Sequence, residues 1–222
     1  FLTDMNCDLP ASAAFLDFQK ANFTSPSVLQ IHGAIITRNG TQDPTDNNLT
    51  PNISADAAES DWRANIGLKN TFVGGRQTVT SANTTTVSAG STWYTLNGVW
   101  SASDLVHFDD PNDITGAGEL RHLGNSPREF KVTAKLVIES TANNVLGIRY
   151  RKYDASTTSY TTFTEQQRQV NSLVGGRDVA IFDMIEYMSL DINDYVYIQV
   201  RNNSGNNNVT CEVDSFFVVS ER

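Results

Sequence analysis

Apolar and polar residues alternate along much of the chain with the period of two that is typical of half-buried β-strands. The clearest case places an apolar residue at every second position: Phe130, Val132, Ala134, Leu136 and Ile138. Because successive side chains of a strand point to opposite faces of a sheet, this pattern predicts one buried face and one outward face. No stretch has the longer period of a long helix, so the pattern favours an all-β fold.

The segment from Leu190 to Val219 reads as an acidic turn, a strand, a polar turn and a final strand. In residues 195–200 the apolar side chains at even positions lie opposite two tyrosines and a glutamine. Residues 201–208 are rich in Asn, Ser and Gly and predict a chain reversal. For the final strand we expect one mostly apolar face: Val209, Cys211, Val213, Ser215, Phe217 and Val219. Such a hairpin places the C-terminus inside a sheet.

Further short strands are expected at regular intervals from Trp93 onward, which favours a β-sandwich. They cover residues 105–108, 119–123, 145–153 and 179–187. A Thr/Ser-rich loop is expected between Tyr153 and Phe163.

The N-terminal part has a weaker pattern. One or two helical turns are conceivable in residues 11–20, and residues 28–36 predict a strand rich in β-branched residues. Residues 37–61 form a long polar excursion, which in a compact domain is usually functional, a linker, or packed against a neighbouring chain. Gly74-Gly75 marks a turn or a bulge.

Residues 81–90 are almost entirely Ser, Thr, Ala, Asn and Gly, and they read as an extended connector. We therefore place the domain boundary between about residues 80 and 92. Residues 1–90 are expected to form an extended, β-rich neck or attachment region, with intertwining between subunits left open. Residues 91–222 are expected to form a compact knob.

The charge balance limits the partners. With 16 basic and 25 acidic residues the net charge is -9, which argues against nucleic-acid binding because that needs a basic face. The densest basic group is Arg149, Arg151 and Lys152, which we interpret as a solvated strand edge. No run of about 18 apolar residues occurs, so we expect no membrane insertion.

No constellation of residues specifies a reaction, and we expect no catalytic residues, no cofactor and no metal. His32, His107 and His122 each stand alone, without ligand spacing, and structural roles are favoured. The acidic turn at 109–113 is interpreted as a solvated Asx turn rather than a calcium loop. Cys7 and Cys211 set no disulfide framework, and Cys211 is expected to be a small buried hydrophobe.

Residues 118–219 resemble the trimeric C1q/TNF-like jelly-roll modules found at the ends of bacteriophage tail and head fibres. The matching segments are Gly118–Gly124, Phe130–Val132, Leu190–Val200, Arg201–Asn203 and Val209–Val219. Where that family usually has a glycine-aspartate pair, this chain has Asn193-Asp194, a mild departure because Asn also tolerates left-handed geometry. Residues 62–75 similarly resemble the neck that precedes such knobs.

The resemblance implies a C-terminal jelly-roll sandwich, a homotrimer and a place on the virion surface, with head and tail locations both open. The N-terminal region would then contact other virion proteins. Tyr195 and Tyr197 are the candidates for the trimer interface, with an outer solvated face as the alternative.

Exposed loops are expected to contact a host-surface glycan or polymer, because a rigid scaffold positions loops for recognition. The candidate residues are Thr157, Thr158, Tyr160, Asn202, Asn203, Asn206 and Asn207. Two alternatives stay open: a free lectin-like carbohydrate-binding module, and an enzyme acting on host polysaccharide through Asp/Glu pairs that no motif marks.

Overall fold

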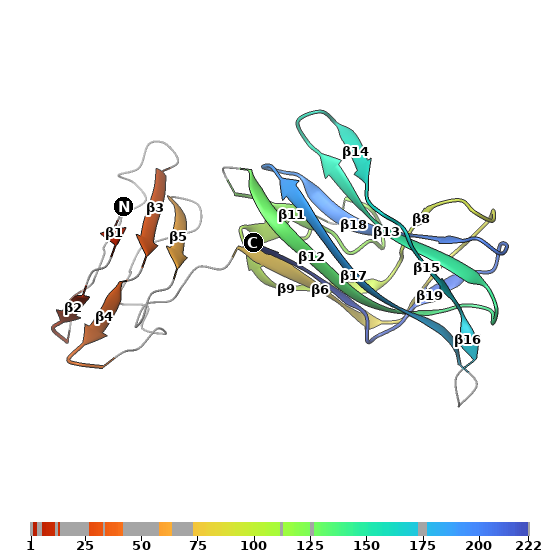
Figure 1. Cartoon of the computed structure of the whole chain (residues 1–222), viewed down its shortest axis with the longest axis horizontal. Coiled ribbons are helices and arrows are strands. Elements are labelled where there is room, and N and C mark those ends of the chain that lie inside the picture. The colour runs from red at the N-terminus through yellow and green to blue at the C-terminus, as the bar shows by residue number, and fades with distance from the viewer. Residues whose placement is uncertain are drawn as a thin grey trace. The chain divides into compact units, whose positions relative to one another are not determined.

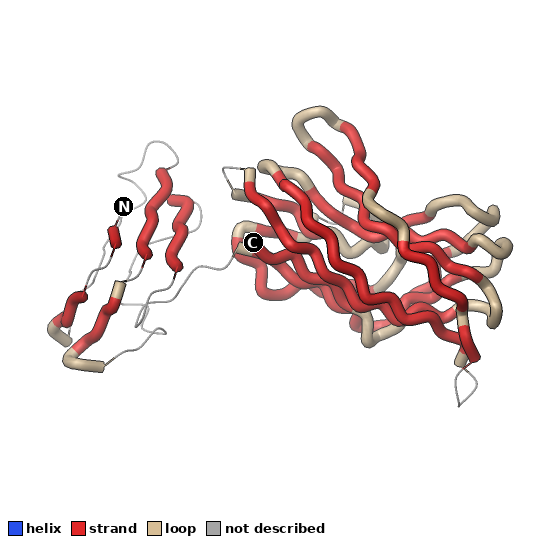
Figure 2. Tube along the Cα trace, in the orientation of Figure 1, coloured by secondary structure: helices blue, strands red, loops and turns tan. Residues whose placement is uncertain are grey.

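The structure is a computed structural model that describes residues 2–3, 6–11, 13, 27–32, 34–41, 58–63, 73–111, 113–124, 127–172 and 177–221. It divides the chain into two compact units, Phe1–Phe72 and Val73–Arg222. Every regular element within these ranges is a β-strand, so the expected all-β fold is confirmed (Figure 2). In the same ranges no helix has the length and apolar character to cross a bilayer.

The first unit contains two small parallel sheets. One has the order β1-β3-β5, formed by Leu2–Thr3, Ser27–His32 and Ala58–Arg63, and in the other Asn6–Leu9 (β2) pairs with Ile35–Arg38 (β4). The single strand expected across residues 28–36 is therefore two strands that belong to different sheets. The predicted helical turns at 11–20 and most of the polar excursion lie outside the described residues.

The second unit is a sandwich of two antiparallel sheets (Figure 1). The first, here called the β12 sheet, has the order β16-β17-β12-β20-β6-β9. Its strands are Asn171–Ser172 (β16), Asp178–Leu190 (β17), Arg128–Glu139 (β12), Phe216–Glu221 (β20), Gly74–Ser81 (β6) and Val99–Val106 (β9). Two short strands, Val209–Cys211 (β19) and Asn83–Thr85 (β7), pair with each other, and β19 also pairs with β12.

The second sheet, here called the β13 sheet, has the order β10-β11-β18-β13-β14. Its strands are Phe108–Asp109 (β10), Leu120–His122 (β11), Tyr195–Asn202 (β18), Val145–Asp154 (β13) and Ser159–Thr162 (β14). In addition Gln166–Gln169 (β15) pairs with β13, and Tyr94–Thr95 (β8) pairs with β18. The long strands β12, β13, β17, β18 and β20 alternate between the two sheets along the chain, which is the course of a jelly roll.

The core lies between the sheets and follows the predicted alternation. The five apolar residues of β12 at positions 130–138 are at most 4% exposed. On β18 the side chains of Val196, Ile198 and Val200 are at most 2% exposed. Cys211 is fully buried with a free thiol, and burial raises its pKa to about 12, which confirms it as a small buried hydrophobe.

The division between the units comes earlier than the expected boundary near residue 90. β6 pairs with β20, and β7 pairs with β19, so the segment that sequence reasoning gave to the neck supplies strands of the sandwich. The turn-rich composition of residues 81–90 reflects short strands and turns at its rim. At Gly74-Gly75, where the sequence predicts a turn or a bulge, the structure has no turn, and the pairing of β6 with β9 shifts register between Gly74 and Arg76.

The last strand is interrupted, contrary to expectation. A turn in which the Ser215 N–H donates to the Glu212 carbonyl at 3.0 Å separates β19 from β20. Val213 lies in this turn and is 49% exposed, so it does not join the buried face with its neighbours. The alternation holds on both sides because each piece pairs separately with β12. The expected loop before Phe163 likewise contains β14, whose exposed side chains give no apolar signal.

A buried carboxylate holds one end of the β13 sheet together. Asn193 adopts φ 66° in the turn before β18, which confirms that Asn takes the left-handed position. The next residue, Asp194, is 1% exposed and accepts hydrogen bonds from the N–H groups of Asp191 (3.0 Å) and Ala155 (2.9 Å). Its carboxylate also forms an ion pair of 2.7 Å with Lys152 Nζ. The turn between β17 and β18 is thus tied to the end of β13.

We expect Asp194→Ala to lower the free energy of unfolding by about 3 kcal/mol, because it leaves two N–H groups without their acceptor. It also leaves Lys152, whose Nζ still donates to the Ser189 carbonyl, without its counter-charge. The exposed Asp214 supplies the control: Asp214→Ala should change stability by less than about 0.5 kcal/mol. Urea unfolding of both variants at one protein concentration measures the difference. A loss below about 1 kcal/mol in Asp194→Ala would contradict the role given to this carboxylate.

Candidate functional site

The two predicted contact loops lie at opposite ends of β13. In the β13–β18 ladder Tyr153 is opposite Tyr195, whereas Leu146 is opposite Asn202. The seven-residue separation along an extended strand corresponds to about 23 Å. The exposed Thr157, Thr158 and Tyr160 therefore do not share a site with the exposed Asn206 and Asn207.

Asn202 is fully buried and has a structural role in its turn. Its Nδ2 donates to the Asn207 carbonyl at 3.1 Å, and its Oδ1 accepts the Ser204 N–H at 3.0 Å. Asn203 is half-buried and donates its backbone N–H to the Val145 carbonyl. The structure corrects the prediction that Asn202 contacts a receptor, because its side chain makes its hydrogen bonds within the turn.

The structure also corrects the trimer-interface prediction for Tyr195 and Tyr197. They are 7% and 2% exposed in the single chain, so almost no surface remains for another subunit. Tyr195 stacks on Tyr153 with ring centroids 4.7 Å apart, and Tyr160 from β14 lies against both buried tyrosines. Burial raises the pKa of both phenols. Sequence reasoning placed them on the outward face correctly but could not show that β14 covers them.

Sequence-distant residues gather on this outward face of the β13 sheet. The register places Arg149 opposite Gln199 and Arg151 opposite Tyr197. These side chains point away from the core, because the even-numbered residues of both strands supply it. We call the following residues the outer cluster: Trp93, Arg149, Arg151, Tyr153, Tyr160, Tyr195, Tyr197, Gln199 and Arg201.

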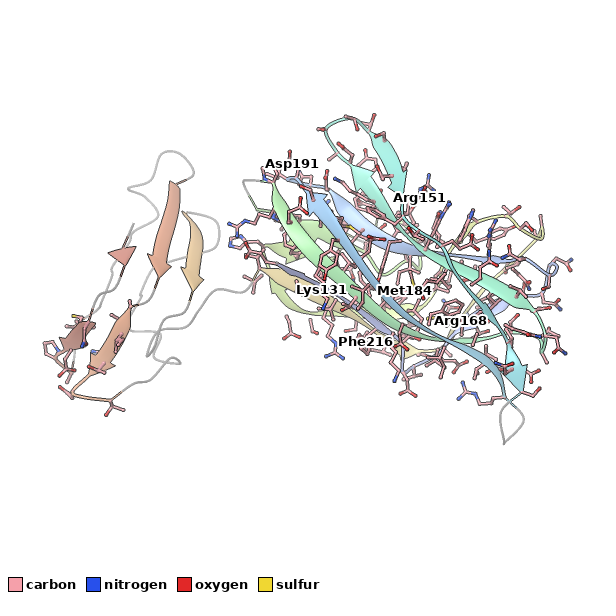
Figure 3. All side chains as sticks on the ribbon, viewed as in Figure 1. Lys131, Arg151, Arg168, Met184, Asp191 and Phe216 are labelled. Atoms are coloured by element: carbon pink, nitrogen blue, oxygen red, sulfur yellow. The ribbon has the colours of Figure 1, made fainter. Side chains whose placement is uncertain are left out.

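Cations and aromatic rings stack in the outer cluster. The guanidinium of Arg149 lies 3.9 Å from the centroid of the Trp93 ring, and that of Arg201 lies 4.8 Å from it. Arg151 lies 4.1 Å from the centroid of Tyr160, and Figure 3 shows it beside β14. Such stacking orders the guanidinium groups while leaving part of their donors available.

The arginines of the outer cluster differ in their partners. Arg201 Nε donates to Glu165 at 3.0 Å, whereas Arg149 donates Nε and Nη2 to the neutral Gln199 Oε1 at 3.0 and 2.8 Å. The Nε of Arg151 is buried without a hydrogen-bond partner. Across the part of the chain that the structure describes, neither Arg149 nor Arg151 has a salt bridge. Burial, then the charges of Arg151 and Arg201, lower the pKa of Arg149.

This arrangement overturns the interpretation of Arg149 and Arg151 as a solvated strand edge. β13 lies inside its sheet, between β18 on one side and β14 and β15 on the other. The spacing of two between the arginines was visible in the sequence and places both on one face of a strand. The contacts of Arg149 with Trp93 and of Arg151 with Tyr160 carried no sequence signal.

His122 and the acidic turn at 109–113, two further candidates from the sequence, make structural contacts. His122 is buried, with its ring 5.3 Å from Phe108 and 5.1 Å from Phe130, so its predicted packing role is confirmed. In the acidic turn Arg121 forms an ion pair of 2.6 Å with Asp109. Within the described ranges no three His, Cys, Asp or Glu residues are grouped to hold a metal ion.

A second buried carboxyl, missed by sequence reasoning, lies next to this acidic turn. Glu119 is fully buried, and its Oε2 accepts the Asp113 N–H at 2.9 Å. Its Oε1 is buried without a hydrogen-bond partner, as are Gln77 Oε1 and Trp100 Nε1. Burial raises the pKa of Glu119 to about 7, so the carboxyl titrates near neutrality. No motif marks it, because its burial follows from the packing of β6 and β11.

No protein-family model matches this sequence, and no curated protein matches it. Among solved structures, the TNF protein Eiger of S. frugiperda is similar, with 10% identity and a TM-score of 0.48, over 68% of this chain and 92% of that one. Murine APRIL is similar over 68% of this chain and 100% of its own, at pH 5.0 (8% identity, TM-score 0.46) and at pH 8.0 (8%, 0.47). These are likenesses of fold alone.

We expect the stability of the chain to fall as pH rises from about 4.5 to about 7, and to level out above this range, through Glu119. The raised pKa means that the folded protein favours the protonated carboxyl, so the stabilisation is complete below the unfolded pKa and lost on ionisation. At about 1.4 kcal/mol per pKa unit the change is about 3 kcal/mol.

Glu119→Gln should remove this contribution, because an amide does not ionise. Urea unfolding at a series of pH values, with Glu129→Gln on the exposed surface as the control, measures it. An unchanged pH profile in Glu119→Gln would show that another group titrates.

Proposed function

We propose that the chain is a virion structural protein: a homotrimeric jelly-roll knob of a bacteriophage fibre or capsid decoration, which contacts a host-surface glycan or polymer. The N-terminal unit would attach it to other virion proteins, and the knob would lie at the virion surface. In this proposal the protein has a structural and a ligand-binding role and does not catalyse a reaction.

The outward face of the β12 sheet is the feature that best supports the proposed trimer. Three large side chains of β17 point outward there: Ile181, Ile185 and Tyr187 are 47%, 60% and 52% exposed. Across the sheet Ile185 is opposite the half-buried Thr133 of β12, which is opposite the half-buried Val218 of β20, and Lys131 and Lys135 lie on either side of this row. Several large apolar side chains exposed on one strand are typical of protein–protein interaction sites.

A second exposed apolar group lies on β9, at the edge of the same sheet. Val99, Leu105 and Val106 are 46%, 38% and 36% exposed. Two different apolar patches suit a head-to-tail contact, in which the face of one copy meets the edge of the next and the ring closes. The outer cluster of the β13 sheet, by contrast, already buries Tyr195 and Tyr197 within one chain.

The virion assignment is supported by the resemblance of residues 118–219 to phage fibre modules. The glycan assignment is supported by the exposed Thr157–Tyr160 hairpin and by the aromatic side chains of the outer cluster. A free lectin-like module remains the alternative. A trimer that associates with purified phage particles would favour the virion role over that alternative.

The purified chain should have a solution mass near three times 24.4 kDa by light scattering. Ile185→Asp should reduce the mass to that of one chain at micromolar concentration, because association would bury an unpaired carboxylate. Ile192→Asp introduces the same change at a 44% exposed isoleucine in the turn after β17 and should leave the trimer intact. A wild-type mass of one chain, or equal effects of the two substitutions, would count against this interface.

A further inference from the structure

The outer cluster has more positive charge than its own chain neutralises. Arg149, Arg151 and Arg201 lie on one face of two paired strands, and Glu165 is their one carboxylate partner among the described residues. Like charges on neighbouring positions of a sheet destabilise it. The chain has a net charge of -9, yet these arginines keep an excess of positive charge. This excess points to an anionic ligand that is not part of the chain.

The donors are held in place for such an anion. Gln199 is 4% exposed, and its Oε1 receives two hydrogen bonds from Arg149, which orients the guanidinium and leaves its remaining N–H groups free. Arg151 is oriented by the Tyr160 ring, and because its Nε is buried, its terminal N–H groups are the ones that an anion from outside would contact. Two oriented guanidinium groups match the paired acceptor oxygens of a carboxylate or a phosphate.

The rings beside the arginines indicate what carries the anion. Trp93 is half-buried and Tyr160 is 45% exposed, so both flank the guanidinium groups at the surface. An aromatic ring offers a flat apolar surface together with a polar edge, which suits the mixed C–H and hydroxyl surface of a sugar. A nucleic acid fits poorly, because the rest of the chain is acidic and would repel an extended polyanion.

We propose that the outer cluster binds an acidic saccharide, with Arg149 and Arg151 holding its carboxylate or phosphate group and with Trp93 and Tyr160 flanking the sugar ring. Gln199 acts as a positioning residue for Arg149. This proposal deepens the glycan-recognition part of the proposed function and rests on it. It does not depend on the trimer, because all of these residues belong to one chain.

The test is calorimetric titration of the full chain with three probes: an oligogalacturonate, which carries carboxylates, a glycerol-phosphate oligomer, which carries phosphates, and a neutral dextran oligomer. We expect binding of at least one acidic probe, none of dextran, and weakening with added salt. The two acidic probes distinguish the two sources of the anion. Failure of both to bind would overturn the proposal.

Two substitutions test the assignment of residues. Arg151→Gln removes one donor group, and Gln199→Glu places a carboxylate against Arg149, so that the chain supplies its own anion. Each should weaken binding of the acidic probe by about tenfold or more, since a hydrogen bond to a charged group is worth about 1.5–3 kcal/mol. Unfolding measured in parallel should show Gln199→Glu to be at least as stable as the wild type.

The matched control is Arg168→Gln on β15, an exposed arginine whose loss changes the net charge by the same amount as Gln199→Glu (Figure 3). It should leave affinity within about twofold of the wild type, because exposed charges contribute little. Equal losses in Gln199→Glu and Arg168→Gln would mean that only long-range charge matters, and would overturn the site. Equal binding of a poly-glutamate peptide would overturn the saccharide assignment in favour of an acidic protein partner.

Light scattering on the same samples separates this proposal from the preceding one. A trimer that binds neither acidic probe would overturn the saccharide site and leave the knob intact. A monomer that binds an acidic probe, with binding lost in Gln199→Glu, would support the site and overturn the trimer.

Discussion

The pairing of β13 with β18 is the constraint on which both the core and the outer cluster depend. Even-numbered residues of these strands fill the core, and odd-numbered residues build the outward face. A slip of one residue would exchange the two sets, burying arginines and exposing valines. The Asp194 carboxylate prevents such a slip at one end, because it binds the turn before β18 and the end of β13 at the same time. One buried charge thus fixes the positions of residues that lie far from it.

The two outward faces of the sandwich have different chemistry, and for this reason we propose assembly for one face and ligand recognition for the other. The β12 sheet exposes Ile181, Ile185 and Tyr187 along β17, apolar side chains that gain free energy when another copy covers them, and the charged Asp183, Lys131 and Lys135 lie on the same face. On the β13 sheet the aromatic rings are packed against arginines of the same chain, so covering them with an apolar surface would strand the guanidinium groups. The first face is suited to a subunit, and the second to a ligand that brings negative charge.

Local patterns predicted the framework well because they report on which face a side chain occupies. The alternation in β12, the bulge at Gly74-Gly75 and the left-handed Asn193 all follow from the chemistry of a few neighbouring residues. Predictions failed where a distant element changed the outcome. Tyr195 and Tyr197 point outward as expected, yet β14 covers them, and β6 joins the sandwich through its pairing with β20.

The outer cluster was not predicted because its residues come from strands that are distant in sequence. Trp93 and Arg201 are far apart in sequence and meet because β8, directly after Trp93, pairs with β18, which contains Arg201. Arg149 joins them because β13 also pairs with β18. Judged by sequence alone, Arg149 and Arg151 are two charged residues on a strand, for which solvation is the ordinary expectation. The structure changes this interpretation because the residue opposite Arg149 is the neutral Gln199. A carboxylate at this position would have neutralised the charge of Arg149. A neutral residue such as Gln199 points to a binding site only when the strand register shows that it lies opposite an unneutralised charge.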